Sequence, residues 1–435
     1  MRKLLVLGAG TAGTMVVNKL RPLLPRDAWE ITIVDQVEEH HYQPGYLFIP
    51  FGTYRPEEVV KPRQRLISDG VTQVTGEIDD VVPDERHVRL ADGTELAYDQ
   101  LVIATGTHPA PEETPGLDDP QARDRGVHSF YTLEDAVALR GALRGFEGGR
   151  LVVNLVDLPI KCPVAPLEFA FLAEAWLREQ GLRERTELTY VTPLDGAFTK
   201  PLASRELGGM FAARGIELEP DFLLERVDLD AQALVSFDER EVPFDLLVTV
   251  PVNMGAAFVG RSGLGDELRH VKVDPHTFLA DGHEDIFALG DAANLPTSKA
   301  GSVAHFAVDV FADNFLEHIE ERPMTAAFDG HANCFIESGD GKALLLDFNY
   351  DTEPLLGHFP LPGVGPLTLL AESEANHLGK LAFRWIYWHV LLPGRPLPLA
   401  TAMTMLGKVR PSSEQETNGE AADVPRPSGL QEVSM

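Results

Sequence analysis

The chain has 435 residues, of which 44% are hydrophobic, enough for two or three globular domains with separate cores. Its formal net charge of −30 argues against a nucleic-acid partner, because phosphate binding needs clustered lysine and arginine. No apolar run reaches the ~20 residues of a membrane-spanning helix, and two cysteines are too few for a disulfide scaffold.

A glycine-rich motif follows the first predicted strand, which runs from Lys3 to Leu7. In such a motif the first glycine permits a tight turn, the second lets a pyrophosphate approach the backbone, and the third lets the helix pack closely on the strand. The helix N-terminus then offers unpaired N–H groups to phosphates. A carboxylate at the end of the next strand binds ribose hydroxyls. The motif predicts a dinucleotide site at Gly8, Gly10, Thr11, Ala12, Gly13 and Asp35.

No secretory signal precedes this first strand, so we expect the protein on the cytoplasmic side of the compartment that makes it. Residues 71–103 are predicted to form a small antiparallel insert that leads into the buried strand QLVI and the turn Ala104-Thr105-Gly106. A second buried strand, IFAL, leads to Gly290-Asp291, and a helix start containing Lys299, Ala300 and Gly301 follows it.

The layout of strand, turn and helix is repeated at residues 150–178, but without the glycine motif. The predicted strand RLVVNLVD is followed by the turn Leu158-Pro159-Ile160-Lys161-Cys162-Pro163-Val164-Ala165-Pro166 and then by a helix. A cysteine among prolines replaces the glycines that would admit a second pyrophosphate. The position at the helix start favours a thiolate at Cys162 by lowering its pKa. The alternative is a small buried apolar side chain.

Taken together, these motifs resemble those of the sulfide:quinone oxidoreductase family of two-dinucleotide-binding flavoproteins. The resemblance covers roughly residues 1–410 and rests on GAGTAG, YQPG, ATG, KCPVAPLE, ALGDAAN, SKAG and a second cysteine, Cys334, in NCFIESGDGK. Glutathione-reductase-like enzymes carry a redox cysteine pair after the first acidic residue, and QVEEHHYQPGYLF contains none. Type II NADH dehydrogenases keep a glycine motif in the second unit, which this chain lacks.

The resemblance implies an α/β fold of two Rossmann-like dinucleotide-binding domains with glutathione-reductase-like topology, plus a C-terminal hairpin and amphipathic-helix region. The expected FAD-binding domain comprises 1–112 and 281–330, the second domain comprises 113–280, and the C-terminal region comprises 331–410. A disordered acidic tail is expected over 411–435. FAD is the implied cofactor, and no metal site is expected. The remaining implied FAD-binding residues are Gln43, Pro44, Ala104, Thr105, Gly106, Gly290, Asp291, Lys299, Ala300 and Gly301.

The resemblance also implies a redox pair of Cys162 and Cys334, in which HS⁻ attacks a sulfur-bridged pair and releases one thiolate. That thiolate then passes two electrons to the flavin. Many family members carry a third cysteine that tethers the flavin, but its counterpart here falls near Tyr131, so non-covalent FAD is expected. Residues 129–269 contain no histidine, which leaves Glu168 as the candidate acid/base. An ordinary helix-surface glutamate is the alternative.

The C-terminal region has an acid-free basic stretch, from Ala375 to Arg410. Leu378, Leu381, Ala382, Trp385, Trp388 and Leu392 fall at helical spacing on one predicted face, flanked by Lys380, Arg384 and Tyr387. Such a helix is typical of an anchor that lies on anionic lipid, so residues 376–410 are predicted to meet the membrane surface where a quinone enters. Packing on the protein's own core or on a dimer partner is the alternative.

The residues and the resemblance together favour a peripheral membrane flavoenzyme that oxidises sulfide to sulfur or polysulfide and reduces a quinone. A homo-oligomer is compatible with the sequence. Three alternatives remain open: a soluble flavocytochrome-type sulfide dehydrogenase, a type II NADH:quinone oxidoreductase, and a non-catalytic FAD-binding redox sensor.

Overall fold

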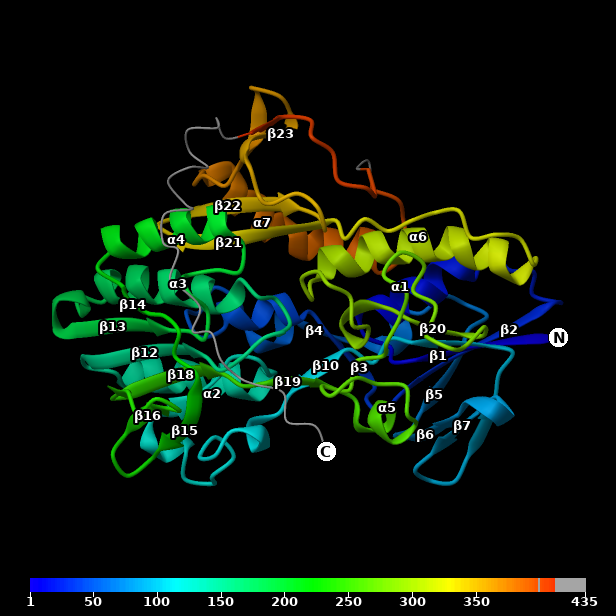
Figure 1. Cartoon of the computed structure of the whole chain (residues 1–435), viewed down its shortest axis with the longest axis horizontal. Coiled ribbons are helices and arrows are strands. Elements are labelled where there is room, and N and C mark those ends of the chain that lie inside the picture. Colours follow the sequence, from blue (N-terminus) through cyan, green and yellow to red (C-terminus); the bar gives the residue numbers. More distant parts are fainter. Residues whose placement is uncertain (398–399, 411–435) are drawn as a thin grey trace, which may run out of the picture.

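The computed structural model describes residues 1–397 and 400–410, so the predicted tail over 411–435 lies outside the described residues. Two parallel sheets lie side by side, and a C-terminal sheet with its helix covers them on one side (Figure 1). This is the predicted α/β arrangement of two Rossmann-like units.

The first sheet combines strands from the N-terminal part of the chain with one strand from beyond the second unit. Its order is β20 (Ile286–Ala288), β9 (Gln100–Ile103), β1 (Arg2–Leu7), β2 (Trp29–Asp35) and β5 (Thr72–Thr75), all parallel. The apolar run at the C-terminal end of β1 is fully buried, as expected for a parallel strand covered on both faces. Helices α1 (Thr11–Leu20) and α6 (Gly301–Ile319) pack against each other beside it.

The prediction of an antiparallel insert over 71–103 was wrong at its start. Strand β5 pairs in parallel with β2, with Val74 opposite Val34, because the open edge of β2 supplies partners for its backbone. The antiparallel insert consists of β6 (Ile78–Val82), β7 (His87–Leu90) and β8 (Glu95–Ala97).

The second sheet repeats the parallel pattern. Its order is β11 (Val127–His128), β18 (Leu246–Val250), β12 (Gly149–Leu155), β13 (Thr186–Val191) and β14 (Glu217–Glu219). Its helices are α2 (Leu133–Gly145), α3 (Ala165–Glu179) and α4 (Pro201–Ala213), and β15 (Leu224–Asp228), β16 (Ala233–Ser236) and β17 (Glu241–Pro243) form an antiparallel sheet beside it. The remaining short elements are β3 (Glu39–His41), β4 (Val60–Pro62), β10 (Thr107–Pro109), β19 (Asn253–Gly255) and α5 (Ala257–Arg261).

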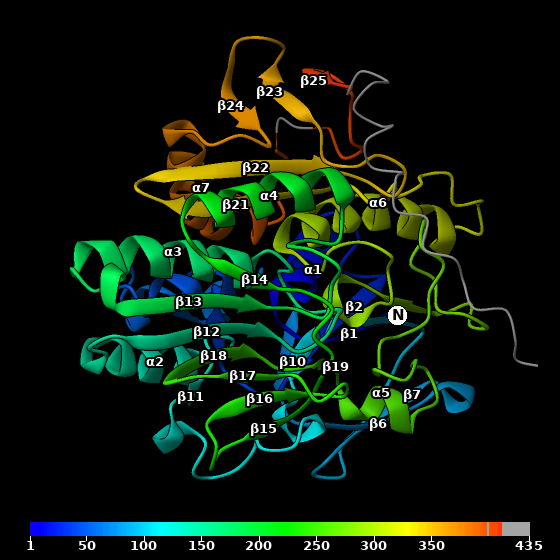
Figure 2. The same cartoon turned by 60° about the vertical axis from the view of Figure 1, so that its left-hand side comes forward.

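The C-terminal sheet has the order β21 (Ala332–Gly339), β22 (Lys342–Phe348), β24 (Gly365–Leu369), β23 (Leu356–Leu361) and β25 (Lys408–Val409). Figure 2 shows β21 and β22 stacked beside α3 and α4. Strand β21 packs against α3, the helix that follows the turn of Cys162. Helix α7 (Glu374–Ile386) packs on β21, β22 and β24 and continues into a π-helix over Tyr387–Leu391.

The predicted apolar face of this last helix is divided by the π-helix. Leu378 and Trp385 on α7 are 63% and 62% exposed, whereas Trp388 and Leu392 are buried. A π-turn inserts an extra residue per turn and so rotates the side chains that follow it. The prediction of a single face was therefore wrong for Trp388 and Leu392, which belong to the protein core.

Candidate active site

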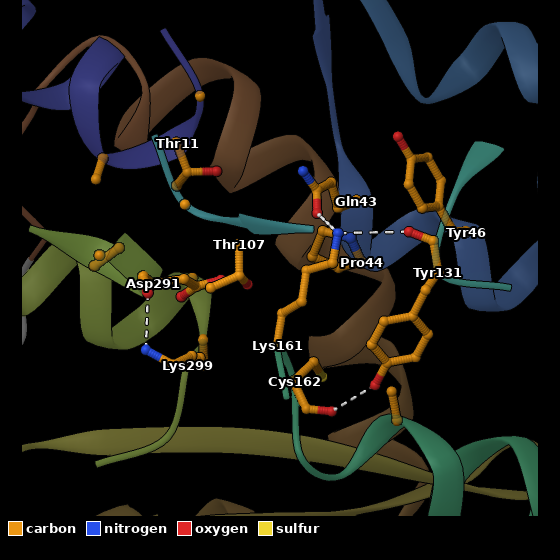
Figure 3. Close-up of a pocket in the computed structure, with 18 of the residues that line it drawn as sticks. Thr11, Gln43, Pro44, Tyr46, Thr107, Tyr131, Lys161, Cys162, Asp291 and Lys299 are labelled. Carbon is orange, nitrogen blue, oxygen red and sulfur yellow. Dashed lines mark hydrogen bonds between the residues drawn. The ribbon is translucent and has the colours of Figure 1, made fainter. Parts of the chain in front are cut away.

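One large pocket lies where the two parallel sheets and α7 meet (Figure 3). Residues that follow strands β1 and β9 of the first sheet line it: Gly10, Thr11, Ala12, Ala104, Thr105 and Gly106. The return segment of the first domain, residues 281–330, contributes Gly290, Asp291, Lys299, Ala300 and Gly301. Gln43 and Pro44 lie on its wall, as do Cys162 and Glu168 from the second unit. The predicted site residues that do not line it are Gly8, Gly13, Asp35 and Cys334.

The first turn, residues 8–13 between β1 and α1, has the backbone geometry that its glycines predict. Gly8 has φ +93°, and a Cβ there would lie 2.5 Å from the Ala104 carbonyl oxygen. A Cβ on Gly13 would lie 1.9 Å from the Gly8 carbonyl oxygen, so this glycine permits the helix to approach the strand. A Cβ on Gly10 would meet no protein atom within 4 Å. Space is thus left beside the backbone at the one glycine where a pyrophosphate is expected.

The pocket wall also carries polar groups without protein partners. The buried hydroxyls of Thr105 and Thr107 have no hydrogen-bond partner. Helices α1 and α6 both begin at the pocket without a side-chain cap, which leaves N–H groups for an anion. Asp35 lies behind the turn and accepts the Ala9 amide at 2.6 Å. These donors and acceptors fit a dinucleotide that carries hydroxyls and a pyrophosphate.

Two lysines organise the centre of the pocket. Lys299 donates to the carbonyl oxygens of Asp291 and Ala293 at 2.8 and 3.0 Å. Lys161 reaches across to the Gln43 side-chain oxygen at 3.0 Å (Figure 3). Burial lowers the pKa of each lysine to about 8, against the opposing effect of Asp291. Sequence reasoning missed Lys161, although it directly precedes Cys162 in KCPVAPLE.

The second turn presents Cys162 to the pocket in a left-handed backbone conformation, with φ +53°. Its amide donates to the Lys299 carbonyl oxygen at 2.6 Å, and its carbonyl oxygen accepts the Tyr131 hydroxyl at 3.4 Å. Few residues other than glycine adopt such a φ, and those that do are concentrated at functional sites. The cysteine is therefore held by contacts with both the first sheet's return segment and the second unit.

Glu168 is fully buried, so the alternative of a helix-surface glutamate was wrong. Its Oε1 atom accepts the Lys380 ammonium at 2.7 Å and the Glu337 amide at 2.9 Å, while Oε2 has no partner. Burial raises the pKa of Glu168 although Lys380 opposes the shift. Burial acts to lower the pKa of Lys380, but the negative charges of Glu168 and Cys162 outweigh burial and raise this pKa. The pair places a buried charge next to the sulfur site.

The two cysteines are free thiols in the structure. Burial and then Glu168 raise the pKa of Cys162 to about 12, although Lys380 acts in the opposite direction. The expectation that the helix start lowers this pKa was therefore wrong, because removal from water outweighs the helix dipole. Burial likewise raises the pKa of Cys334, and the neighbouring Cys162 adds to the shift. Cys334 lies in β21, behind the pocket wall.

The basic residues of the C-terminal region are mostly used inside the protein. Lys380 is paired with Glu168, and the fully buried Lys408 side chain binds Asp347 at 2.8 Å. Arg384 pairs with Glu58 at 3.3 Å and covers the ring of Tyr54. The prediction that these residues attract anionic lipid was therefore wrong for both lysines, since a charge buried in an ion pair does not face lipid.

Sequence reasoning also missed a buried network that joins the C-terminal region to the first turn. The Tyr387 hydroxyl lies 2.8 Å from Thr11 Oγ1 and 2.7 Å from His40 Nε2. His40 Nδ1 lies 3.1 Å from the Ala9 carbonyl oxygen, and burial lowers the pKa of His40 to about 4. A neutral imidazole thus supports the glycine turn. The pattern EHHYQPG contains these histidines but no periodic signal for the contact.

Comparisons with known proteins cover nearly the whole chain. The family profile described as pyridine nucleotide-disulphide oxidoreductase matches residues 2–153. The mitochondrial sulfide:quinone oxidoreductase of Mus musculus is 25% identical over 399 residues, which cover 90% of this chain and 86% of the relative. The corresponding protein of Dictyostelium discoideum is 26% identical over 400 residues, with the same two coverages. The chain is thus similar to sulfide:quinone oxidoreductases, at about a quarter identity, over nine-tenths of its length.

This similarity and the matched pyridine nucleotide-disulphide oxidoreductase profile support an FAD-dependent oxidoreductase. The fold agrees with that of the sulfide:quinone oxidoreductase of Aquifex aeolicus, with a TM-score of 0.77 and 19% identity; the match covers 98% of this chain and 96% of that one. Within residues 1–397 and 400–410, no helix combines the length and apolar character needed to cross a bilayer.

Proposed function

We propose that the protein oxidises sulfide at Cys162 and Cys334 and transfers the electrons through non-covalently bound FAD to a quinone at a membrane surface. The observation that carries the proposal is the convergence on one pocket of the glycine turn, Cys162 and the ion pair Glu168–Lys380. Sulfide and quinone are the substrates in the names of the curated relatives.

FAD would be held by the N-termini of α1 and α6, with its pyrophosphate beside Gly10 and its hydroxyls near Asp35 and Asp291. When bound, it accepts two electrons from sulfur and returns them to a second substrate. Tyr131 occupies the region where some family members carry a tethering cysteine, and its hydroxyl bonds the Cys162 carbonyl oxygen. A tyrosine forms no thioether, so we propose that FAD is released intact from the denatured protein.

In the sulfur half-reaction, HS⁻ attacks a disulfide of Cys162 and Cys334 and gives one persulfide, Cys–S–SH, and one thiolate. Closure of the persulfide and the thiolate to a trisulfide releases one proton and two electrons, and bound FAD would take up the two electrons. The Lys380 ammonium acts against the rise in the Cys162 pKa and so stabilises that thiolate, and Glu168 holds the ammonium in place. Glu168 lines the pocket with one carboxylate oxygen free to accept the proton.

The other side of the pocket suits a planar apolar acceptor. Tyr46 and Leu47 from the 3-10 helix Gln43–Phe48, together with Phe383 and Tyr387 from the C-terminal helix, form its apolar wall. The Lys380 ammonium also lines the pocket, where it can hydrogen-bond a quinone carbonyl oxygen. The acceptor then leaves as a quinol after taking up two electrons and two protons.

An anaerobic titration tests the proposal with the purified yellow protein. Sulfide should bleach the flavin absorbance, and a short-chain quinone should restore it within one turnover. Bleaching by sulfide with recovery only on addition of a cytochrome c would favour the flavocytochrome-type alternative. A flavin that sulfide leaves oxidised would contradict the proposal and favour a redox sensor or an NADH dehydrogenase.

Membrane contact is proposed through the exposed side of α7, which carries Leu378 and Trp385, while Phe383 of the same helix lines the pocket. Burial of two large apolar side chains in lipid contributes a few kcal/mol, at roughly 1.5–3 kcal/mol each. In a vesicle-flotation assay, Leu378→Ser/Trp385→Ser should move the protein out of the lipid fraction. Its turnover with a short-chain, water-soluble quinone should stay unchanged, because neither side chain lines the pocket.

The matched control is Leu223→Ser/Phe237→Ser, since these side chains are 58% and 70% exposed beside the second sheet. This control should float with vesicles like the wild type. Equal flotation of both double variants would contradict the placement of the membrane contact. High salt should release little protein, because the basic residues Lys380 and Lys408 are paired internally.

A further inference from the structure

A cluster of titratable side chains lies between the pocket and the surface on the side of Lys380. Glu337 is 1% exposed, and both of its carboxylate oxygens lie within hydrogen-bond distance of His377 Nδ1, at 3.0 and 2.9 Å. The His377 side chain is 25% exposed to solvent. The amide of Glu337 donates to Glu168, whose carboxylate faces the pocket. A buried acid thus lies between the pocket and an imidazole that is partly exposed to solvent.

The secondary structure holds these groups in line. His377 and Lys380 are three residues apart on α7 and so share one side of the helix. The side chains of Phe335 and Glu337 are two residues apart on β21 and so lie on the same face of this strand. Lys380 donates to the Phe335 carbonyl oxygen at 3.0 Å. The other titratable groups around Glu337 are Glu168 on α3 and Tyr54, whose ring Arg384 covers.

The reaction needs such a connection. Oxidation of HS⁻ to sulfane sulfur releases one proton and two electrons, and reduction of a quinone consumes two protons and two electrons. The balance, HS⁻ + H⁺ + quinone → S⁰ + quinol, requires one proton from solvent in each turnover. The pocket itself is apolar on its quinone side, so protons need a path through buried acids.

We infer that His377 and Glu337 form a proton path from solvent to Glu168 and Lys380 for quinone reduction, an inference that rests on the proposed function. His377 takes a proton from water and passes it through Nδ1 to the Glu337 carboxylate. Glu168 and Lys380 are close enough for their charges to act on the Glu337 carboxyl, and Glu337 passes the proton on to Glu168 at the pocket wall. Burial raises the pKa of Glu337, so that it holds a proton at a higher pH than an exposed glutamate does, although His377 opposes the shift.

Stopped-flow measurements on His377→Asn and Glu337→Gln separate the two half-reactions. Sulfide-driven bleaching of the flavin should stay within about twofold of wild type, because that half takes up no proton. Reoxidation by a short-chain quinone should slow by about tenfold at pH 9 and by less at pH 6, where water supplies protons more readily. Added imidazole should restore the rate of His377→Asn but not that of Glu337→Gln. His283→Asn, in the turn before β20, is the matched control and should behave like wild type.

A second measurement needs neither sulfide nor turnover. In the FAD-loaded protein labelled with ¹³C-glutamate, the Glu337 carboxyl should titrate at a higher pH in His377→Asn, which removes the hydrogen bond that lowers its pKa. Quinone reoxidation at the wild-type rate in both variants across this pH range would overturn the path and leave the proposed function intact. Wild-type enzyme that sulfide reduces but quinone does not reoxidise would overturn both.

Discussion

The two turns that begin α1 and α3 occupy equivalent places in the two Rossmann-like units, yet they differ in chemistry. Each follows a buried parallel strand and opens on the same pocket. The first turn leaves empty space next to Gly10, whereas the second fills the equivalent region with Cys162 and prolines. The topology of a βα unit thus provides a place for a ligand, and the residues of its turn decide which chemistry occurs there.

The supports behind the two turns differ as well. The first is held by neutral hydrogen bonds from His40 and Tyr387. The second is held from behind by the ion pair of Glu168 and Lys380. A neutral network suits a turn that must receive a pyrophosphate, while a positive charge suits a turn that must release a thiolate.

The strongest test of the second turn is removal of its sulfur. Cys162→Ser and Cys334→Ser should each lower sulfide-dependent flavin reduction by more than about a hundredfold, because a hydroxyl is neither a sulfur electrophile nor a good leaving group. FAD content should be unchanged, since both residues lie outside the glycine turn. Near-full activity of Cys334→Ser would reduce that residue to a core-packing role.

The first turn can be tested by filling its empty space. Gly10→Asp should lower FAD content by about tenfold or more, because a carboxylate would stand where the pyrophosphate binds the helix N-terminus. The free energy of unfolding of the apoprotein should not fall, since an acidic residue at a helix N-terminus is favourable. Gly209→Asp, a helix glycine with equally free surroundings, should keep its flavin. Normal FAD content in Gly10→Asp would contradict the placement of the pyrophosphate.

A nucleotide competitor tests the difference between the turns directly. NADH should reduce the flavin about a hundredfold more slowly than sulfide does, because Pro159, Pro163 and Pro166 replace the glycines of a second pyrophosphate site. The measurement is the rate of anaerobic flavin bleaching at saturating NADH. Fast, saturable reduction would move the assignment to the type II dehydrogenases.

Acid should weaken the support of the first turn. The unfolded chain has a histidine pKa near 6.5, and burial lowers the pKa of His40 to about 4, so the unfolded state binds more protons between these values. The contribution of His40 to the free energy of unfolding is therefore fully present above pH 6.5. It falls by roughly 3 kcal/mol as the pH decreases toward 4. The free energy of unfolding, measured with urea at pH 7 and at pH 5, should therefore fall less between these two pH values in His40→Gln than in the wild type. An identical loss in both proteins would exclude His40 as the cause.

Much of the fold and part of the site follow from local patterns in the sequence. The Gly8 turn, the buried strands before Gly106 and Asp291, and the strand–turn–helix unit around Cys162 each carry a signal within a short stretch of sequence. A glycine that needs φ +93°, or a run of apolar residues in a buried parallel strand, can be read without knowledge of distant residues.

The environment of those residues was decided only by the tertiary structure. Lys380 lies 212 residues from Glu168 in the sequence, so an apparently basic membrane-facing lysine becomes the partner of a buried acid. The π-helix turns Trp388 and Leu392 into the core, against the helical period that predicted an exposed face. The pKa of Cys162 rises because burial outweighs the helix start. Desolvation and charge pairing depend on distant segments, and for that reason the sequence predicts which groups react but not how they are charged.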